Sequence, residues 1–295
     1  MLGDNPFFGV DHLSRERARQ SVAQSQNFDN AIKILQYCSN AGANGMVMST
    51  HPKAINFIDR LGQDPGLINK ISFFIILPYM QGYVLKINEQ GMIKTLIDII
   101  NPPNSLRSKF KMVTRGTLVA IRRDFSELFR FFIDAELLRL SNINIKMVFL
   151  HDVLTDLALS LNLKTIFETF QEHLHDEYNI EAGLVTKNFP KLTSKLNEWG
   201  LKFSTIMTSF NTLGFQMNPS RQLCEHCLPN YDGNIIAMSV LAGGYISPKA
   251  AYEYILAQPK IRTVVIGISS IDHARNIFEL FLKRKHSSNC YYNST

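Results

Sequence analysis

The sequence predicts a (β/α)8 barrel, and three observations lead to that prediction. Eight short apolar runs, often β-branched and bounded by polar or turn residues, are typical of buried parallel strands. Segments with helical spacing lie between these runs, so strand and helix alternate along the chain as in parallel sheets with crossover helices. The length of 295 residues suits one such barrel. An open doubly wound sheet is the alternative, but the segment GDNPFFG in the first run does not match the glycine-rich fingerprint GxGxxG.

The N-terminal part of the chain supplies three strands and a long connection. The strands are expected over residues 2–9, 45–49 and 71–77, with helices over residues 28–41 and 51–62. The connection 78–144 holds two more helical segments, 88–101 and 124–141, and a basic stretch in which residues 110–121 could form an extra strand pair. Insertions of this size often cover one end of a barrel or form an interface. We expect this insertion to be the contact surface if the chain forms a homo-oligomer.

The second half of the chain alternates more regularly. Its strands are expected over residues 145–150, 182–186, 203–209, 234–240 and 262–268. Its helices are expected over residues 153–177, 190–199, 219–228, 248–258 and 271–285. We expect residues 1–285 to form a single domain and residues 286–295 to form a flexible tail.

The composition predicts a soluble, cytoplasmic protein. Hydrophobic residues make up 45% of the chain and charged residues 19%, a balance that allows a sizeable core. Apolar runs such as FFIIL are too short to cross a bilayer, and the first ten residues lack the basic region of a signal peptide. The net charge of +6 comes from scattered basic groups, which favours an anionic or phosphorylated small molecule as partner over nucleic acid or a membrane.

The cysteines do not predict a metal site. Cys224 and Cys227 in CEHC have the spacing of half a zinc site, but the sequence offers no second pair of ligands. Buried or half-buried free thiols on a short helix are the simpler interpretation.

Candidate catalytic residues follow from the barrel, because active sites of this fold lie where strands end and loops begin. His151, in FLHD, leaves the fourth strand and could act as an acid, a base or a donor to a carbonyl group. Asp152 beside it could fix its tautomer or cap the next helix. Asp4, His51 and Lys187 are candidates near the ends of other strands. Asp4 could instead bridge the first strand to its neighbour, His51 could cap the next helix, and Lys187 could bind an anion or form a Schiff base.

The stretch VVIGISSIDHARNIFEL, residues 264–280, runs from a strand through small residues into a helix. Free backbone N–H groups and the positive end of the helix dipole at such a turn suit a phosphate. Gly267, Ser269 and Ser270 are therefore candidates for binding an anion, and a plain strand-to-helix joint is the alternative.

The second half of the chain resembles the aldo-keto reductases. The likeness covers roughly residues 145–285 and rests on FLHD, on EAGLVTKNFPKLTSKLNEWGLKFSTIMTSFNTL, on NIIAMSVLAGG and on TVVIGISSIDHARNIFEL. It implies a barrel that binds NADP with the loops after strands seven and eight, and His151 at the position that polarises the substrate carbonyl. By position, it implies pyrophosphate contacts from Ser239, Leu241, Gly243 and Gly244, adenosine-side contacts from Ser269, Ser270 and Arg275, and nicotinamide contacts from Asn188 and Ser209.

The chain departs from this family in its catalytic residues. The second strand, in GMVMSTHPKAINF, has neither the expected aspartate nor the tyrosine, and the third ends at Pro78 where the family has lysine. We therefore expect an NADP-linked oxidoreductase whose active site is rebuilt. A non-redox lyase, isomerase or hydrolase acting on a phosphorylated or carboxylated metabolite is the second hypothesis, and a non-catalytic, partner-binding barrel is the third.

Overall fold

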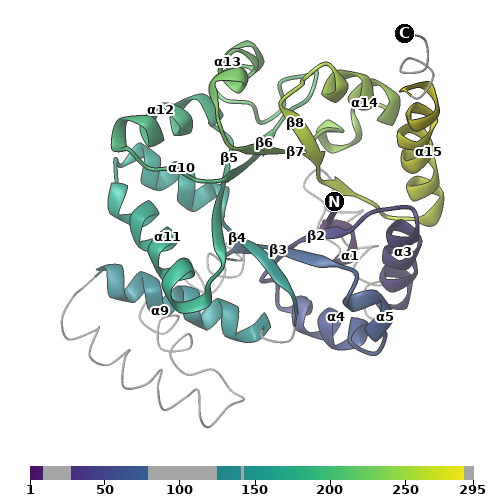
Figure 1. The fold of residues 1–295 in the computed structure, drawn as a ribbon, viewed down its shortest axis with the longest axis horizontal. Coiled ribbons are helices and arrows are strands. Elements are labelled where there is room, and N and C mark those ends of the chain that lie inside the picture. Colours follow the sequence, from purple (N-terminus) through teal and green to yellow (C-terminus); the bar gives the residue numbers. More distant parts are fainter. Residues whose placement is uncertain (9–27, 79–124, 141–142, 289–295) are drawn as a thin grey trace.

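The computed structural model describes residues 1–8, 28–78, 125–140 and 143–288. Within this part of the chain, parallel strands form a closed ring with helices around its outside, a (β/α)8 barrel (Figure 1). The strands are β1 (Leu2–Gly3), β2 (Gly45–Ser49), β3 (Ser72–Leu77), β4 (Ile145–Leu150), β5 (Glu181–Thr186), β6 (Thr205–Ser209), β7 (Asn234–Met238), β8 (Ile261–Val264) and β9 (Ile266–Gly267).

The barrel closes because the eighth strand changes partner at Val265. Before this residue β8 pairs with β7, and after it β9 pairs with β1 in the register Leu2 to Ile266. The amide of Val265 donates to the carbonyl of Ala237 at 2.9 Å, and that of Ile266 donates to the carbonyl of Met1 at 3.1 Å. The predicted strand 262–268 is therefore two short strands that join the last and first parts of the ring.

The inside of the barrel is filled by apolar side chains from alternate positions of the strands. Val47, Met147, Phe149, Val185, Met207 and Ile236 form this buried cluster. A Cβ atom on Gly183 would lie 2.4 Å from the ring of Phe149, so the glycine leaves the space that the ring occupies. Residues between these positions, such as Met48, Val148 and Leu184, face outward into the larger core beneath the helices.

The helices cover this outer face of the strands (Figure 1). They are α1 (Asn5–Phe8), α3 (Asp29–Asn40), α4 (Lys53–Leu61), α5 (Pro65–Ile68), α9 (Phe125–Leu137), α10 (Asp152–Ser160), α11 (Lys164–Tyr178), α12 (Phe189–Trp199), α13 (Arg221–Cys227), α14 (Pro248–Leu256) and α15 (Ile271–Ser288). Short 3-10 turns occupy Leu138–Leu140, Leu228–Asn230 and Ala242–Gly244. Because α15 packs beside α3, the helix layer also closes on itself.

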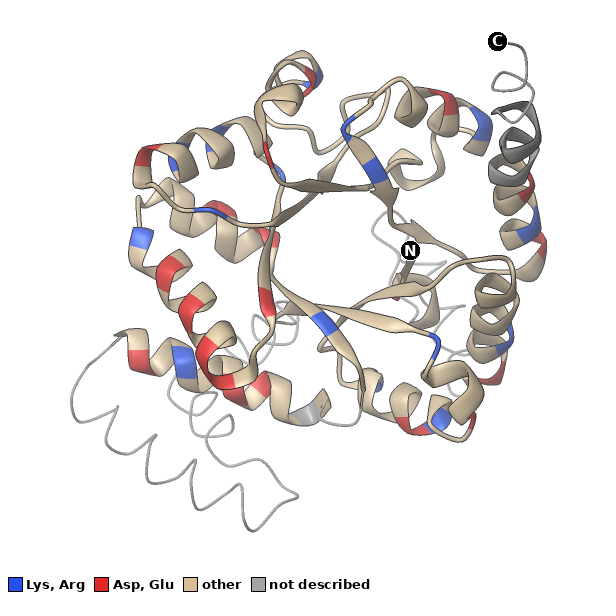
Figure 2. Ribbon diagram, in the orientation of Figure 1, with Lys and Arg blue, Asp and Glu red and all other residues tan. Residues whose placement is uncertain are grey.

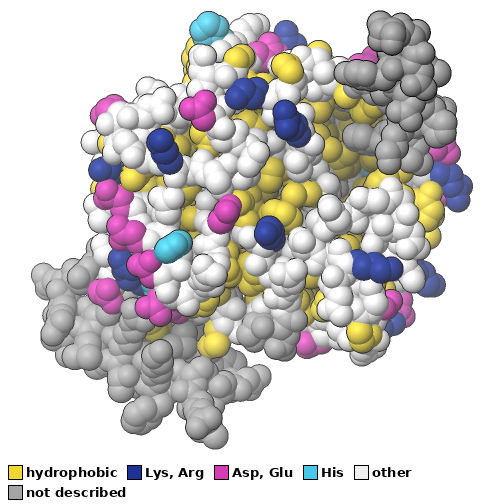
Figure 3. All heavy atoms as spheres, viewed as in Figure 1, with side chains coloured by type: hydrophobic (Ala, Val, Ile, Leu, Met, Phe, Trp, Pro, Cys, Tyr) yellow, Lys and Arg dark blue, Asp and Glu magenta, His cyan; other side chains and the backbone are white. Residues whose placement is uncertain are grey.

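Charged residues lie mainly on the outer helices, while the strands carry few (Figure 2). On the face of the molecule shown in Figure 3, hydrophobic side chains gather over the middle, above the strands. No helix in the described ranges is both long and apolar enough to span a membrane.

The first predicted strand, residues 2–9, is wrong after Gly3. The chain turns into α1 instead, where the carbonyl of Asp4 accepts hydrogen bonds from the amides of Phe7 and Phe8 at 2.8 and 3.2 Å. Pro6 suits the first turn of a helix, because it lacks the N–H that would have no partner there. Both phenylalanines are buried, and the ring of Phe8 stacks on that of His51 with centroids 5.1 Å apart.

Two other predictions needed correction. The predicted helix 153–177 is two helices, because the chain turns at Asn162, which has a left-handed φ of 57°. The predicted strand 234–240 ends at Met238, since Ser239 also has a left-handed φ, of 54°. The short helix α5 was not predicted, although Asp64 caps it by accepting from the amide of Leu67 at 3.0 Å.

Several predictions fall wholly or partly beyond the described ranges. The helix 88–101 and the possible strand pair at 110–121 lie outside them, as does most of the insertion 78–144. The predicted tail begins inside α15, which continues to Ser288, and residues 289–295 are outside the description.

Candidate active site at the barrel mouth

All the strands are parallel, so their carboxyl ends lie at one end of the barrel, here called the mouth. His151 follows β4, Lys187 follows β5, and Asp4 follows β1. His151 and Lys187 come two residues after the inward-facing Phe149 and Val185, so the alternation of the strands directs both toward the mouth.

Asp152 joins His151 to Lys187. One of its carboxylate oxygens, Oδ1, lies 2.6 Å from Nδ1 of His151, and the other, Oδ2, lies 2.9 Å from the Lys187 ammonium. Nδ1 of His151 also accepts from the amide of Val153 at 3.2 Å, and the same amide donates to Oδ1 of Asp152 at 3.0 Å, so both residues cap the start of α10.

The three side chains differ in exposure, which sets their electrostatics. Burial alone would raise the pKa of Asp152, whose side chain is 11% exposed, but hydrogen bonds and charge from His151 and Lys187 outweigh it and lower the pKa below its usual range. Asp152 is therefore ionised at neutral pH. The side chains of His151 and Lys187 are 27% and 35% exposed, so a small molecule at the mouth can reach them.

A second carboxyl group lies at the end of β1. Oδ2 of Asp4 accepts from the amide and the hydroxyl of Ser49 at 2.7 and 2.8 Å, which ties the end of β1 to the end of β2. Burial raises the pKa of Asp4, and the hydrogen bonds from Ser49 only partly offset that effect. Ser49 occupies the end of the strand where the resemblance led us to look for an aspartate.

His51 begins the turn into α4. Its Nδ1 accepts from the amide of Lys53 at 3.0 Å, and its ring stacks on Phe8. Burial, followed by the nearby charge of Lys53, lowers the pKa of His51 to about 4, so the ring is neutral at pH 7. These contacts match the capping alternative. His51 follows Ser49, the hydrogen-bond partner of Asp4, by two residues along the chain.

The loops after β6 and β7 are held together by Asn211, which lies just beyond the sixth strand. Its side-chain amide nitrogen donates to the carbonyls of Phe215 and Ser239 at 2.9 and 3.3 Å, and its oxygen accepts from the amide of Phe215 at 2.8 Å. The residue is fully buried. Its sequence signal is an amide two residues after the predicted strand 203–209.

Two features of these loops fit a bound dinucleotide. The hydroxyl of Ser209, buried at the end of β6, has no hydrogen-bond partner in the described structure. Gly243 and Gly244 are exposed with positive φ values of 71° and 97°, and a Cβ on Gly244 would meet no atom within 4 Å. An unpaired hydroxyl and an open glycine turn are the groups that a polar ligand needs. Ser239 and Leu241 precede the turn, and the hydroxyl of Ser239 reaches Gln216 at 3.5 Å.

The turn after β9 connects this strand to α15 and caps the start of that helix. The hydroxyl of Ser270 accepts from the amide of His273 at 3.1 Å and so caps α15, while Ser269 and Gly267 are exposed. A Cβ on Gly267 would lie 3.1 Å from the ring of Pro6, so this turn packs against α1. Arg275 is exposed and pairs with Asp272 at 3.2 Å. Asn188, after β5, caps α12 by accepting from the amide of Lys191 at 3.3 Å.

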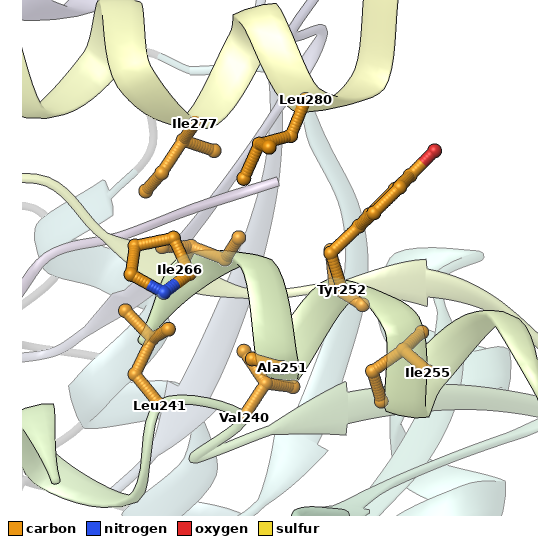
Figure 4. A pocket seen from close by; sticks show the side chains of 10 residues that line it. Val240, Leu241, Ala251, Tyr252, Ile255, Ile266, Ile277 and Leu280 are labelled. Carbon is orange, nitrogen blue, oxygen red and sulfur yellow. The ribbon is translucent and has the colours of Figure 1, made fainter. Parts of the chain in front are cut away.

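An apolar hollow lies between α14, α15 and the eighth strand, and Leu241, from the loop after β7, is among its lining residues (Figure 4). It holds about 350 Å³ of empty space, part of it open to solvent. Ala251, Ile255 and Ile277 are among its lining residues, and the Tyr252 hydroxyl points away from it (Figure 4). Since the lining offers almost no polar atoms, the hollow is a packing feature, and the mouth is the candidate site.

No group of three or more His, Cys, Asp or Glu side chains arranged to hold a metal ion occurs among the described residues. Cys224 is buried and Cys227 is half-buried on α13, both with free thiols.

Solved structures with the same fold include aldo-keto reductases. One from Bacillus halodurans, in its holo form, is 13% identical with a TM-score of 0.56, over 94% of this chain and 84% of that one. A Pseudomonas aeruginosa protein classed with these reductases is 15% identical with a TM-score of 0.58, over 94% and 87%. An aldo-keto reductase from a Medee basin deep-sea metagenome library is 12% identical with a TM-score of 0.53, over 85% and 80%.

At these identities the likeness shows a shared fold. No protein-family model matches the chain, and no curated protein matches its sequence.

Proposed function

We propose that the chain is an NADP-linked oxidoreductase that acts on the carbonyl group of a small molecule. The observation that carries the proposal is the bridge from His151 through Asp152 to Lys187, at the mouth of a barrel shared with aldo-keto reductases. The holo form of the Bacillus halodurans enzyme supports a cofactor role for this fold. The sequence resemblance is the reason for choosing NADP.

In this proposal the loops after β6, β7 and β9 hold the cofactor. Ser209 and Asn188 lie on the nicotinamide side, the turn from Ser239 to Gly244 lies along the pyrophosphate, and Ser269, Ser270 and Arg275 lie on the adenosine side. When bound, the cofactor would supply or accept the hydride.

The side chains at the mouth would move the proton. His151 would deliver a proton to the substrate oxygen, and Asp152, 2.6 Å from Nδ1 of its ring, would hold the ring in place. Lys187 supplies positive charge beside the developing oxyanion and keeps Asp152 ionised. Asp4 and His51 are proposed to shape the neighbouring part of the mouth.

Cofactor binding is the first test, by titrating the protein with NADPH and following protein and nicotinamide fluorescence. We expect saturable binding at one site, weakened about tenfold in Arg275→Ala by loss of a charged contact. Arg262→Ala is the matched control, because Arg262 is exposed near the start of β8, at the end of the barrel opposite the mouth. Absence of binding at millimolar NADPH would refute the proposal.

Turnover of carbonyl substrates is the second test. We expect His151→Gln to bind NADPH normally and to lower kcat by about 10²- to 10⁴-fold, the usual contribution of a general acid. His175→Gln should leave kcat unchanged, since His175 is 78% exposed on the outer helix α11. Equal rates for wild type and His151→Gln would contradict the role of His151.

A non-redox function is the second candidate, and one observation favours it. Arg275 is already paired with Asp272, while His151, Asp152 and Lys187 form an acid–base set that needs no hydride. A lyase or isomerase acting on a phosphorylated or carboxylated metabolite would use the same three residues. Failure of NADPH to bind, with inorganic phosphate binding retained, would favour this candidate.

A further inference from the structure

A second carboxylate of α10, that of Asp156, reaches the end of β5 beside the bridge already described. Its Oδ1 accepts from the hydroxyl of Thr186, and its Oδ2 accepts from the backbone amide of Lys187 at 3.1 Å. Asp152 and Asp156 are four residues apart, so they lie on the same face of the helix. One face of α10 therefore contacts Lys187 twice, at its ammonium through Asp152 and at its backbone through Asp156.

The effect of Asp156 extends to Asn188. The hydroxyl of Thr186, which donates to Asp156, also accepts from the amide of Asn188 at 2.9 Å. On the other side of the turn, the carbonyl of Lys187 accepts from the amide of Asn218 at 2.8 Å. The backbone of residues 186–188 is thus held from two directions, and Asp156 supplies the contacts from α10.

Placing a carboxylate at position 156 costs free energy that an apolar side chain packed there would not. Burial raises the pKa of Asp156, and the nearby charge of Asp152 acts in the same direction, while hydrogen bonds from Thr186 and Lys187 oppose them. Two carboxylates one helical turn apart repel each other, so an apolar residue at position 156 would be the more stable choice unless the turn needs an acceptor.

We infer that Asp156 is a positioning residue for the mouth. It holds the turn of residues 186–188 so that the Lys187 ammonium reaches Asp152 and Asn188 keeps its place at the start of α12. The roles of Lys187 and Asn188 rest on the proposed function, but the placement of Lys187 by Asp156 is testable without it.

The direct test measures how fast a trace of acetic anhydride acetylates Lys187, by mass spectrometry of the peptides, with exposed Lys202 as internal standard. In Asp156→Ala, we expect Lys187 to react about fivefold faster, because loss of a partly exposed ion pair frees about 1 kcal/mol of restraint on the amine. Asp156→Asn should stay within about twofold of wild type, since its amide can accept from Lys187 and donate to Thr186.

Asp134→Ala is the matched control for losing a carboxylate that holds two neighbours. Asp134, on α9, binds the ring of His173 at 2.6 Å and the hydroxyl of Tyr178 at 2.7 Å, outside the mouth. We expect this variant to leave the acetylation rate of Lys187 unchanged. If Asp156→Ala does not fold, Thr186→Val removes the hydroxyl that donates to Asp156 and should likewise raise the acetylation rate of Lys187.

Kinetics then connect the placement to the proposed reaction. If NADPH-dependent turnover is found, Asp156→Ala should lower kcat by about 10- to 100-fold, as expected for a misplaced catalytic group, with little change in substrate KM. Asp156→Asn should restore most of the rate.

The outcomes separate the two claims. An unchanged Lys187 rate in a folded Asp156→Ala or Thr186→Val protein would overturn the inference. Faster acetylation without any NADPH binding would uphold the inference and refute the proposed function.

Discussion

At the scale of single residues, the mouth contains groups whose environments push their pKa values in opposite directions. Asp152 is held ionised by His151 and Lys187, whereas burial raises the pKa of Asp4. Carboxyl groups whose pKa values are shifted in opposite directions often divide the acid and base roles of an active site between them. Their positions at the ends of β1 and β4 leave β2 and β3 between them, with strand spacings of about 5 Å each.

His51 gives a prediction about acid stability. Its ordinary pKa is 6.5, and burial together with Lys53 lowers it to about 4 in the folded protein. As the pH falls from 6.5 to about 4, the unfolded chain takes up a proton that the folded chain does not, so the free energy of unfolding decreases across this window. His51→Asn should flatten that decrease while keeping a side chain that can cap α4.

Urea unfolding at several pH values between 7 and 4 would check this prediction. His175→Asn, at an exposed position, serves as control and should follow wild type. A His51→Asn profile parallel to wild type across the window would contradict the lowered pKa.

At the scale of elements, the fit of β5 against β4 rests on one glycine. Because a Cβ on Gly183 would lie 2.4 Å from the Phe149 ring, Gly183→Ala should destabilise the protein by about 1–3 kcal/mol through overpacking. Adding Phe149→Leu should recover part of that loss, since the smaller side chain leaves space for the new methyl group. Equilibrium unfolding of the two single variants and the double variant would measure this coupling, and strictly additive effects would contradict it.

Regular elements were predictable where the apolar pattern decides the structure. The fourth and fifth strands follow from runs such as IKMVFL, because burial on both faces requires apolar residues throughout. Most outer helices follow from the helical spacing of their apolar residues. The pattern could not reveal α1, since NPFF is equally apolar in a strand or a helix. The break between α10 and α11 was not predicted, because the segment around Asn162 contains neither Gly nor Pro. Asparagine can adopt the left-handed conformation without either residue nearby.

The candidate site was predictable only in part. Parallel strands bring their ends together, so His151 and Lys187 could be expected at one end of the barrel from the strand count alone. The role of Asp156 could not, because a carboxylate within a helix is usually on the solvated face, and only packing shows that it faces β5. The partners of Asn211 also depend on the paths of two loops that no local pattern determines.

At the scale of the whole molecule, closure of the barrel depends on its shortest strands. The β1–β9 contact pairs Leu2 with Ile266 and Gly3 with Gly267, whereas β2–β3 and β3–β4 pair over longer stretches. Local stability follows the extent of hydrogen bonding and burial, so the ring should open first at this seam.

Native-state hydrogen exchange would test that order of opening. The amide of Ile266, which donates to Met1, should exchange at least about tenfold faster than that of Leu184 in the middle of β5. Leu2→Ala should widen the difference by weakening β1 alone. Equal exchange rates at the two amides would mean that the ring opens as one unit.

The ring of Phe149, packed over Gly183 inside the barrel, also determines how molecules move through the site. Within the part of the chain that the structure describes, these side chains fill the barrel axis, so a ligand of the proposed site would enter and leave at the mouth. A product would then have to depart before the next substrate could reach His151, and a molecule bound deeper would be trapped by the one above it. In a two-ligand reaction this imposes an order of arrival, in which the more deeply bound ligand comes first and leaves last.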